Sequence, residues 1–182
     1  VGIAYNNINL DGVSPDIVKA LKLLFESAKE RTEAFKLNLE YLASLFKEAT
    51  FKYAFLKGAV LTSTIYPEGY RTSNHIDILV AEKDITAAQR ILKDAGFIQG
   101  WIDNDGSIVK ATRSEILMSR MNYGETVPFV KYNDQRPLTV DINFSLDYKP
   151  ENEKQIVDSF LSNNTYISND KYGFYSLNRI DF

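Results

Sequence analysis

The segment 76–81 places the tightest constraint on the fold of this chain. It reads Ile-Asp-Ile-Leu-Val-Ala and is the clearest pattern for a buried strand in the sequence. Asp84 then predicts the N-terminus of a helix that carries apolar residues at helical spacing and ends before Gly96. Strands that alternate with helices in this way favour an α/β or α+β protein built on a mixed sheet.

The other elements follow from changes in the hydrophobic period. A serine, a proline and an aspartate at 14–16 are typical of a helix start, so two leading helices are expected, at 14–28 and 32–49. From Phe51 the period becomes that of strands. We expect further strands at 53–57, 97–102, 127–132 and 138–146, and further helices at 59–66, 113–121 and 151–161. The last two strands should pair antiparallel across the polar loop 133–137.

The pattern divides the chain into three parts. Residues 1–50 form an N-terminal helical lead, residues 51–148 a core of strands and helices, and residues 149–182 a C-terminal helix and tail. With 182 residues, of which 45% are hydrophobic, the chain can bury a core without disulfides. The tail 172–182 is too apolar for a free terminus, so the parent protein is expected to continue. The absence of an initial Met suggests that earlier residues were removed.

Composition and charge exclude several classes of function. The net charge of −3 does not favour general binding to nucleic acid phosphates. With no cysteine and one histidine, His75, the chain cannot form a thiolate site or a multi-histidine zinc site. No purely apolar run exceeds four residues, so we expect no membrane-spanning segment, and the first residues lack a secretory signal. A cytoplasmic protein is therefore the default expectation.

Two of the expected strands carry polar residues on one face. Side chains two apart in a strand share a face, so His75 and Asp77 should point the same way, and so should Asp141 and Asn143. If these strands are neighbours, Asp77 and Asp141 repel unless a cation lies between them, which indicates a divalent-metal site. The alternatives are that Asp141 faces water on a half-exposed sheet and that His75 is a partly exposed residue at a loop edge. An unpaired Asp77 inside an apolar strand would be costly.

A second feature is the junction of strand and helix at Lys57 and Gly58. Free amides at a helix N-terminus, a residue without a Cβ and a nearby ammonium group together suit a phosphate. Arg71 lies in the loop before the acidic strand and could clamp a polyphosphate. The alternatives are that Gly58 is a structural turn residue, that Lys57 is solvated and that Arg71 is an ordinary surface arginine.

Taken in order, these motifs resemble the uncharacterised nucleotidyltransferase family of the DNA polymerase-β-like superfamily. The motifs are Leu56-Lys57-Gly58, Tyr66-Pro67, Arg71-x-Ser73, Ile76-Asp77-Ile78-Leu79-Val80, Ala95-Gly96-Phe97 and Val140-Asp141-Ile142-Asn143. The resemblance covers the chain from Phe51 to Leu146. It implies an α+β fold, namely a nucleotidyltransferase-like mixed β-sheet with flanking helices and an N-terminal helical lead.

The resemblance also implies a site and a reaction. The matching residues are, for catalysis, Asp77 and Asp141; for the metal, His75, Asp77 and Asp141; and for the nucleotide, Lys57, Gly58, Arg71 and Ser73. Such enzymes use Mg²⁺ or Mn²⁺ to move a nucleoside monophosphate from an NTP to a hydroxyl or phosphate acceptor. The acceptor of this chain stays open between a protein, a peptide, an RNA and a small molecule, and no membrane partner is expected.

The chain departs from the family pattern at two positions. His75 stands where the pattern has its first aspartate, and Asn143 where it has a histidine. An imidazole is a poor ligand for Mg²⁺, so we expect the site to prefer Mn²⁺. Asn74 and Glu68 carry nearby oxygens that could compensate for the missing carboxylate. Three hypotheses follow: a metal-dependent nucleotidyltransferase, a nucleotide-binding pseudoenzyme that acts as a regulator or adaptor, and an interaction domain whose 11 Tyr and 11 Phe residues supply contact surface.

Overall fold

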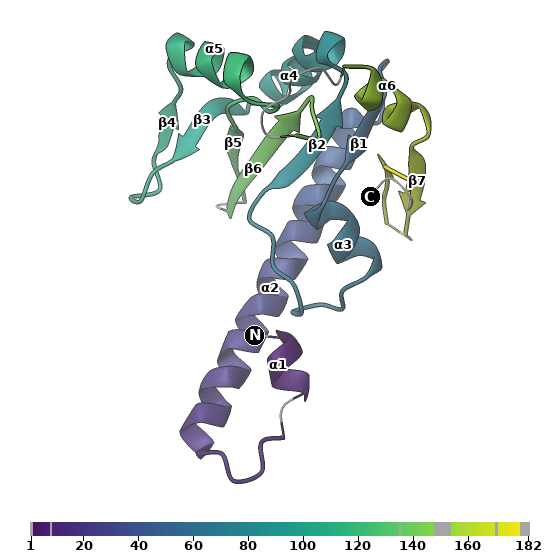
Figure 1. Cartoon of the computed structure of the whole chain (residues 1–182). Coiled ribbons are helices and arrows are strands. Elements are labelled where there is room, and N and C mark those ends of the chain that lie inside the picture. Colours follow the sequence, from purple (N-terminus) through teal and green to yellow (C-terminus); the bar gives the residue numbers. More distant parts are fainter. Residues whose placement is uncertain (1, 8, 135, 148–153, 170, 179–182) are drawn as a thin grey trace.

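The computed structural model describes residues 2–7, 9–134, 136–147, 154–169 and 171–178. In these residues the central element of the fold is an eight-stranded mixed sheet. The strand order is β4-β3-β5-β6-β2-β1-β8-β7 (Figure 1). The strands are β1 (Tyr53–Phe55), β2 (Ile76–Val80), β3 (Ile98–Ile102), β4 (Ile108–Lys110), β5 (Phe129–Asn133), β6 (Arg136–Asn143), β7 (Thr165–Ser168) and β8 (Gly173–Ser176). The pairs β2–β6 and β1–β8 are parallel, and the other neighbouring strands are antiparallel.

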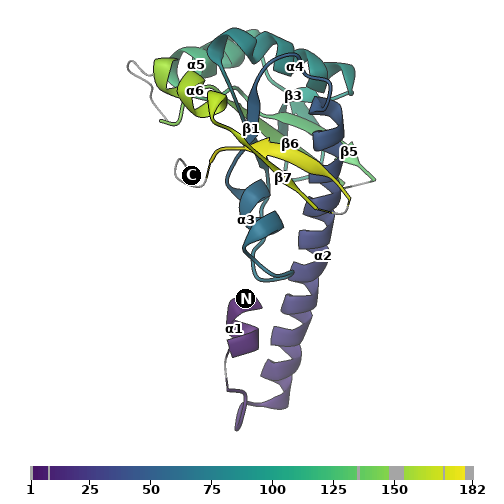
Figure 2. The same cartoon turned by 90° about the vertical axis from the view of Figure 1, so that its right-hand side faces the viewer.

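Six α-helices and one short 3₁₀ helix accompany the sheet in the described residues. They are α1 (Gly2–Asn7), α2 (Pro15–Phe46), α3 (Gly58–Thr64), η1 (Glu82–Asp84), α4 (Ile85–Asp94), α5 (Arg113–Asn122) and α6 (Lys154–Ser162). One half of α2 lies along the sheet and the other half continues beyond it, where α1 lies beside it (Figures 1 and 2). The α+β fold with flanking helices and an N-terminal helical lead is therefore confirmed. None of the described helices is both long and apolar enough to cross a membrane.

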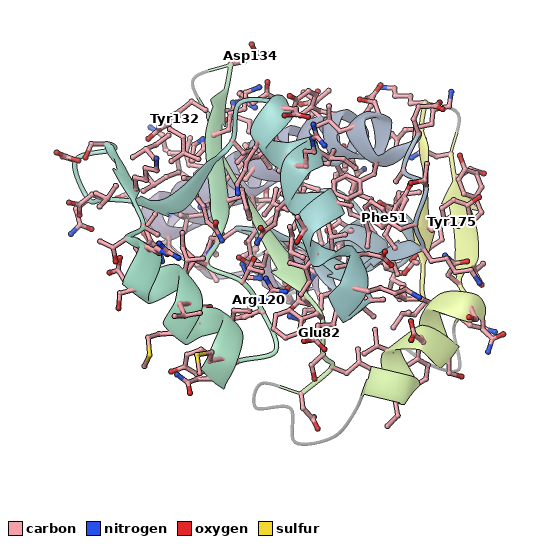
Figure 3. All side chains as sticks on the ribbon, turned by 90° about the horizontal axis from the view of Figure 1, so that it is seen from above. Phe51, Glu82, Arg120, Tyr132, Asp134 and Tyr175 are labelled. Atoms are coloured by element: carbon pink, nitrogen blue, oxygen red, sulfur yellow. The ribbon has the colours of Figure 1, made fainter. Side chains whose placement is uncertain are left out.

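The hydrophobic core occupies both faces of the sheet. On one face, α2 and α4 pack against side chains that include Ile78 of β2 and Ile142 of β6. On the other face, Val157 and Leu161 of α6 pack beside Leu79 of β2. Because successive side chains of a strand point to opposite faces, Asp77 shares the second face with Leu79. Figure 3 shows this packing from above, with Tyr132 of β5 and Tyr175 of β8 on opposite sides of the molecule.

The N-terminal lead differs from the prediction of two helices, because α2 is one continuous helix of 32 residues. It begins at Pro15 as expected, but the segment 29–31 between the two expected helices reads Lys-Glu-Arg, which are all good helix formers. The buried residues continue at spacings of three and four through this segment, which a broken helix would not allow. They are Phe25, Ala28, Thr32, Phe35, Leu39, Leu42, Ala43 and Phe46.

The predicted strands are present, with shifted ends. The hairpin of β5 and β6 is antiparallel as expected, but its strands reach Asn133 and begin again at Arg136, so the loop is shorter than 133–137. The predicted strand 53–57 ends at Phe55, and the predicted helix 151–161 is observed as Lys154–Ser162, with residues 151–153 outside the described part. The helices predicted at 85–95 and 113–121 are confirmed as α4 and α5.

Five short elements were not predicted: α1, η1, β4, β7 and β8. The last two explain the apolar C-terminal tail. They form a hairpin in which Thr165 pairs with Ser176, and β8 then pairs with β1 through Phe55 and Ser176. The tail thereby places Phe174 in the core, fully buried.

Candidate active site

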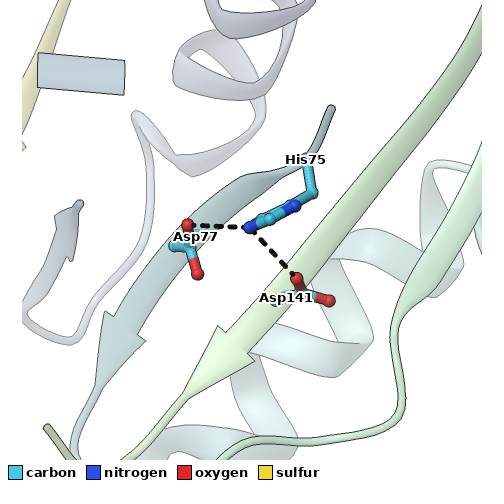
Figure 4. A group of neighbouring side chains, drawn as sticks. All are labelled: His75, Asp77 and Asp141. Atoms are coloured by element: carbon cyan, nitrogen blue, oxygen red, sulfur yellow. Dashed lines mark ion pairs between the residues drawn. The ribbon is translucent and has the colours of Figure 1, made fainter. Parts of the chain in front are cut away.

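Two carboxylates meet on adjacent parallel strands. Asp77 lies in β2 and Asp141 lies directly beside it in β6, in register, as predicted if the two strands were neighbours. His75 precedes β2 and turns its imidazole toward both (Figure 4). Its Nε2 atom is 3.3 Å from Asp77 Oδ2 and 3.9 Å from Asp141 Oδ2. One ligand atom from each of the three residues lies within 4.8 Å of the others.

Asp77 is the most buried member of this group. Only 3% of its side chain is exposed, yet its Oδ1 atom accepts hydrogen bonds from Lys57 Nζ at 2.8 Å and from Asn143 Nδ2 at 3.3 Å. Burial alone would raise the pKa of Asp77, but the hydrogen bonds from His75 and Lys57, with the charge of Lys57, outweigh it and lower that pKa. Asp77 is therefore ionised and held among donors.

Asp141 has the opposite electrostatic character. Burial raises the pKa of its carboxyl group to about 6, and the negative charges of Asp77 and Glu125 add to this, while His75 and Lys57 work against it. The pKa of His75 is also raised, chiefly by its hydrogen bond to Asp77, against its own partial burial. The two adjacent carboxylates repel each other, which favours the binding of a cation between them.

Lys57 reaches Asp77 because β1 runs antiparallel to β2. Leu56 N donates to Asp77 O at 3.0 Å, so the residue that follows β1 comes to lie beside the start of β2. Lys57 has a φ of +43°, a backbone conformation that is strained for a residue with a side chain. One alternative from the sequence was that Lys57 is only solvated. Its side chain is 61% exposed, but its ammonium group also forms an ion pair with Asp77.

Gly58 is required by a close approach of the loop that carries Ser73. A Cβ atom at Gly58 would lie 2.6 Å from Ser73 Oγ, so no side chain fits without a shift of that loop. The Ser73 hydroxyl and the Nε atom of Arg71 are buried and have no hydrogen-bond partner in the described residues. Arg71 also places its guanidinium 5.9 Å from the ring centre of Tyr66.

The residues predicted to bind a nucleotide surround one pocket. Its volume is about 420 Å³, and its lining residues are Lys57, Gly58, Arg71, Thr72, Ser73, Asn74, His75 and Asp77. The basic residues Lys57 and Arg71 therefore line the same pocket as Asp77, and a triphosphate could occupy this space.

Two further residues belong to the site although the sequence did not mark them as site residues. Asn143 donates to Asp77, and the polar alternation of its strand was the available signal. Glu125 forms an isolated bridge with Asn143 and acts on Asp141 through its charge, but no motif marks it. The sequence offered Asn74 and Glu68 as oxygens that could compensate for His75. Asn74 lines the pocket, whereas Glu68 forms an ion pair with Lys36 of α2, with 2.8 Å between Glu68 Oε1 and Lys36 Nζ.

The donor set fits a divalent cation with mixed ligands. Two carboxylate oxygens and one imidazole nitrogen converge here, and the three atoms lie within 4.8 Å of one another. Carboxylates suit Mg²⁺ and Mn²⁺, whereas imidazole suits later transition metals better, so Mn²⁺ matches this set more closely than Mg²⁺ does.

Fold and site together define an α+β protein with a candidate metal centre next to a cationic pocket. A family model described as "Uncharacterised nucleotidyltransferase" matches residues 1–182, so the chain belongs to this family. The resemblance seen in the sequence motifs is thereby confirmed. Searches of curated proteins and of solved structures gave no match.

Proposed function

We propose that this chain is a metal-dependent nucleotidyltransferase that moves a nucleoside monophosphate from an NTP to a hydroxyl or phosphate acceptor. The observation that carries the proposal is the convergence of Asp77 and Asp141 on adjacent strands, beside a pocket that Lys57 and Arg71 make cationic. Family membership supports nucleotidyl transfer in general. The division into residues 1–50, 51–148 and 149–182, and the cytoplasmic location, stay predictions.

His75, Asp77 and Asp141 would hold Mg²⁺ or Mn²⁺. When bound, such an ion neutralises charge on the triphosphate and assists activation of the acceptor oxygen. Lys57, Arg71 and Ser73 would bind and orient the triphosphate, since all three residues line the pocket. Gly58 keeps the Ser73 loop close to the start of α3, because no Cβ intervenes.

The reaction balances with these groups. The acceptor oxygen forms a bond to the α-phosphorus, the bond from that phosphorus to the bridging oxygen breaks, and pyrophosphate leaves with the electron pair. The acceptor proton passes to solvent, because Asp141 would act as a ligand of the ion. A second pocket of about 490 Å³, which shares Ser73, Asn74 and His75 with the first, offers room for the acceptor.

Label transfer tests this function. The chain is incubated with each α-labelled NTP, Mn²⁺ or Mg²⁺ and a cell extract as the source of acceptors. We expect transfer that is faster with Mn²⁺, and a loss of at least about 100-fold in Asp77→Asn and Asp141→Asn, because these changes remove the charges that hold the cation. Asp94→Asn makes the same chemical change on the exposed end of α4 and should retain full transfer.

A nucleotide-binding pseudoenzyme is the second candidate, and one observation favours it. Lys57 contacts one oxygen of Asp77 and His75 contacts the other, so this carboxylate has partners without a metal ion. A nucleotide could then bind the basic residues of the pocket in the absence of a metal. Calorimetric titration with ATP and GTP in EDTA separates the two candidates. Tight metal-independent binding without label transfer, in the unmodified chain and in His75→Asp alike, supports the pseudoenzyme, whereas transfer by the unmodified chain excludes it.

A further inference from the structure

The two oxygens of Asp77 face different partners. Oδ2 lies 3.3 Å from His75 Nε2, and the same nitrogen lies 3.9 Å from Asp141 Oδ2, so these atoms enclose one position for a cation. Oδ1 faces away from that position and accepts from Lys57 Nζ at 2.8 Å and from Asn143 Nδ2 at 3.3 Å. A carboxylate that bridges two metal ions offers one oxygen to each, and here the second oxygen already has a cationic partner.

Lys57 is held at that oxygen by the fold. The backbone bond from Leu56 N to Asp77 O ties the end of β1 to β2, and Lys57 follows in a strained conformation with φ +43°. Lys57 also lines the pocket that Arg71 and Ser73 share, so the same residue contacts Asp77 and borders the space proposed for the triphosphate. An ammonium has three donors and can serve both partners at once.

The charge of the site points the same way. Because His75 replaces an acidic residue of the family pattern, two carboxylates remain in the cluster of His75, Asp77 and Asp141. Before any nucleotide binds, two divalent ions in addition to the ammonium group of Lys57 would bring five positive charges to these two carboxylates, whereas one divalent ion and the ammonium group bring three.

We propose that this site takes a single divalent ion, between His75, Asp77 Oδ2 and Asp141, and that the ammonium group of Lys57 takes the place of a second ion at Asp77 Oδ1. The inference rests on the proposed function for the nucleotide, but it concerns the number of ions and is measured without turnover. It makes Lys57 a residue that sets the metal content of the site, in addition to contacting phosphate.

The first measurement uses Mn²⁺ alone. Calorimetric titration of the unmodified chain should give one Mn²⁺ per chain, and Lys57→Gln should bind that ion at least about tenfold more tightly, because a positive charge beside the carboxylates is gone. Lys52→Gln, which removes an exposed lysine outside the cluster, should leave the affinity unchanged. If Lys57 only positioned Asp77, its loss would weaken Mn²⁺ binding, so an unchanged or weaker affinity in Lys57→Gln overturns the inference.

The second measurement counts ions by electron paramagnetic resonance with a nonhydrolysable NTP present. We expect one Mn²⁺ per complex in the unmodified chain and in Lys57→Arg, which keeps the charge, and two spin-coupled ions in Lys57→Gln. Two coupled ions in the unmodified chain, or a single ion in Lys57→Gln, contradict the inference while leaving nucleotidyl transfer intact. Failure of the analogue to bind would instead count against the proposed function, and the measurement with Mn²⁺ alone would still decide the inference.

Discussion

Asp77 and Asp141 are neighbours in register, yet their surroundings move their pKa values in opposite directions. Burial would raise both, but Asp77 receives hydrogen bonds from His75 and Lys57 that lower its pKa. Within the described part of the chain no comparable donor reaches the carboxyl of Asp141, so burial and the nearby charges of Asp77 and Glu125 raise its pKa to about 6. The fold therefore favours the charged form of Asp77 and disfavours the charged form of Asp141.

This difference predicts that Asp141→Asn stabilises the metal-free chain. The folded chain holds the Asp141 proton up to about pH 6, whereas the unfolded chain releases it near the ordinary carboxyl pKa of 3.8. Folded-state stability therefore falls as pH rises through this window, and removing the charge should recover about 1–3 kcal/mol at pH 8 and almost nothing at pH 4. Urea unfolding of Asp141→Asn and of the unmodified chain, in EDTA at both pH values, measures this difference in the free energy of unfolding.

The same change at Asp77 serves as the matched comparison. Its lowered pKa means that the charged form stabilises the fold above the unfolded pKa, and that this contribution is lost as pH falls. Asp77→Asn should therefore destabilise the chain at pH 8 in the same experiment. Equal effects of the two substitutions would show that the opposite pKa shifts do not govern stability.

At the scale of elements, α2 shows what hydrophobic spacing could and could not predict. The apolar positions and the start at Pro15 were readable from the sequence, but the division into two helices was wrong. Thr32 interrupts the apolar pattern, and only the structure shows how it is accommodated: its Oγ1 donates to Ala28 O at 2.9 Å and is 3.0 Å from Arg71 O. A polar residue thus continues the buried stripe and joins the helix to the loop before β2.

The two halves of α2 should differ in their contribution to stability. Leu42 is fully buried against the sheet, whereas Leu23 is 63% exposed in the half that extends beyond it. Leu42→Ala should lower the free energy of unfolding by about 2–5 kcal/mol, and Leu23→Ala should change it by no more than about 0.5 kcal/mol. Denaturant unfolding of both variants measures this, and similar losses would mean that the outer half is packed as firmly as the inner half.

For the whole molecule, the sequence predicted the long elements and the strands that carry the acidic residues, and it missed the pairings that depend on distant partners. β7 and β8 are short, and their place beside β1 joins residues more than a hundred positions apart. The candidate site follows the same rule. Alternation predicted that Asp77 and Asp141 would meet if their strands were neighbours, whereas the contacts of Asp77 with Lys57 and Asn143 needed the register of three strands.

The C-terminal hairpin should be part of the cooperative fold. Phe174 is buried with its ring centre 5.4 Å from that of Phe55, whereas Tyr166 on the adjoining strand is 56% exposed. Phe174→Ala should cost about 3–5 kcal/mol of stability, and Tyr166→Ala clearly less. Thermal and urea unfolding test this, and equal, small losses would indicate a hairpin that contributes little to the core.

The positive φ of Lys57 limits how this position can change during evolution. Glycine or asparagine would relax the backbone at the junction of β1 and α3, a gain on the order of 1 kcal/mol, but neither supplies a cation to Asp77. Replacement of Lys57 by either residue would remove the positive charge that pairs with the buried carboxylate of Asp77. The charge beside Asp77 and the backbone conformation of the turn therefore make opposite demands on position 57, and this chain has lysine there.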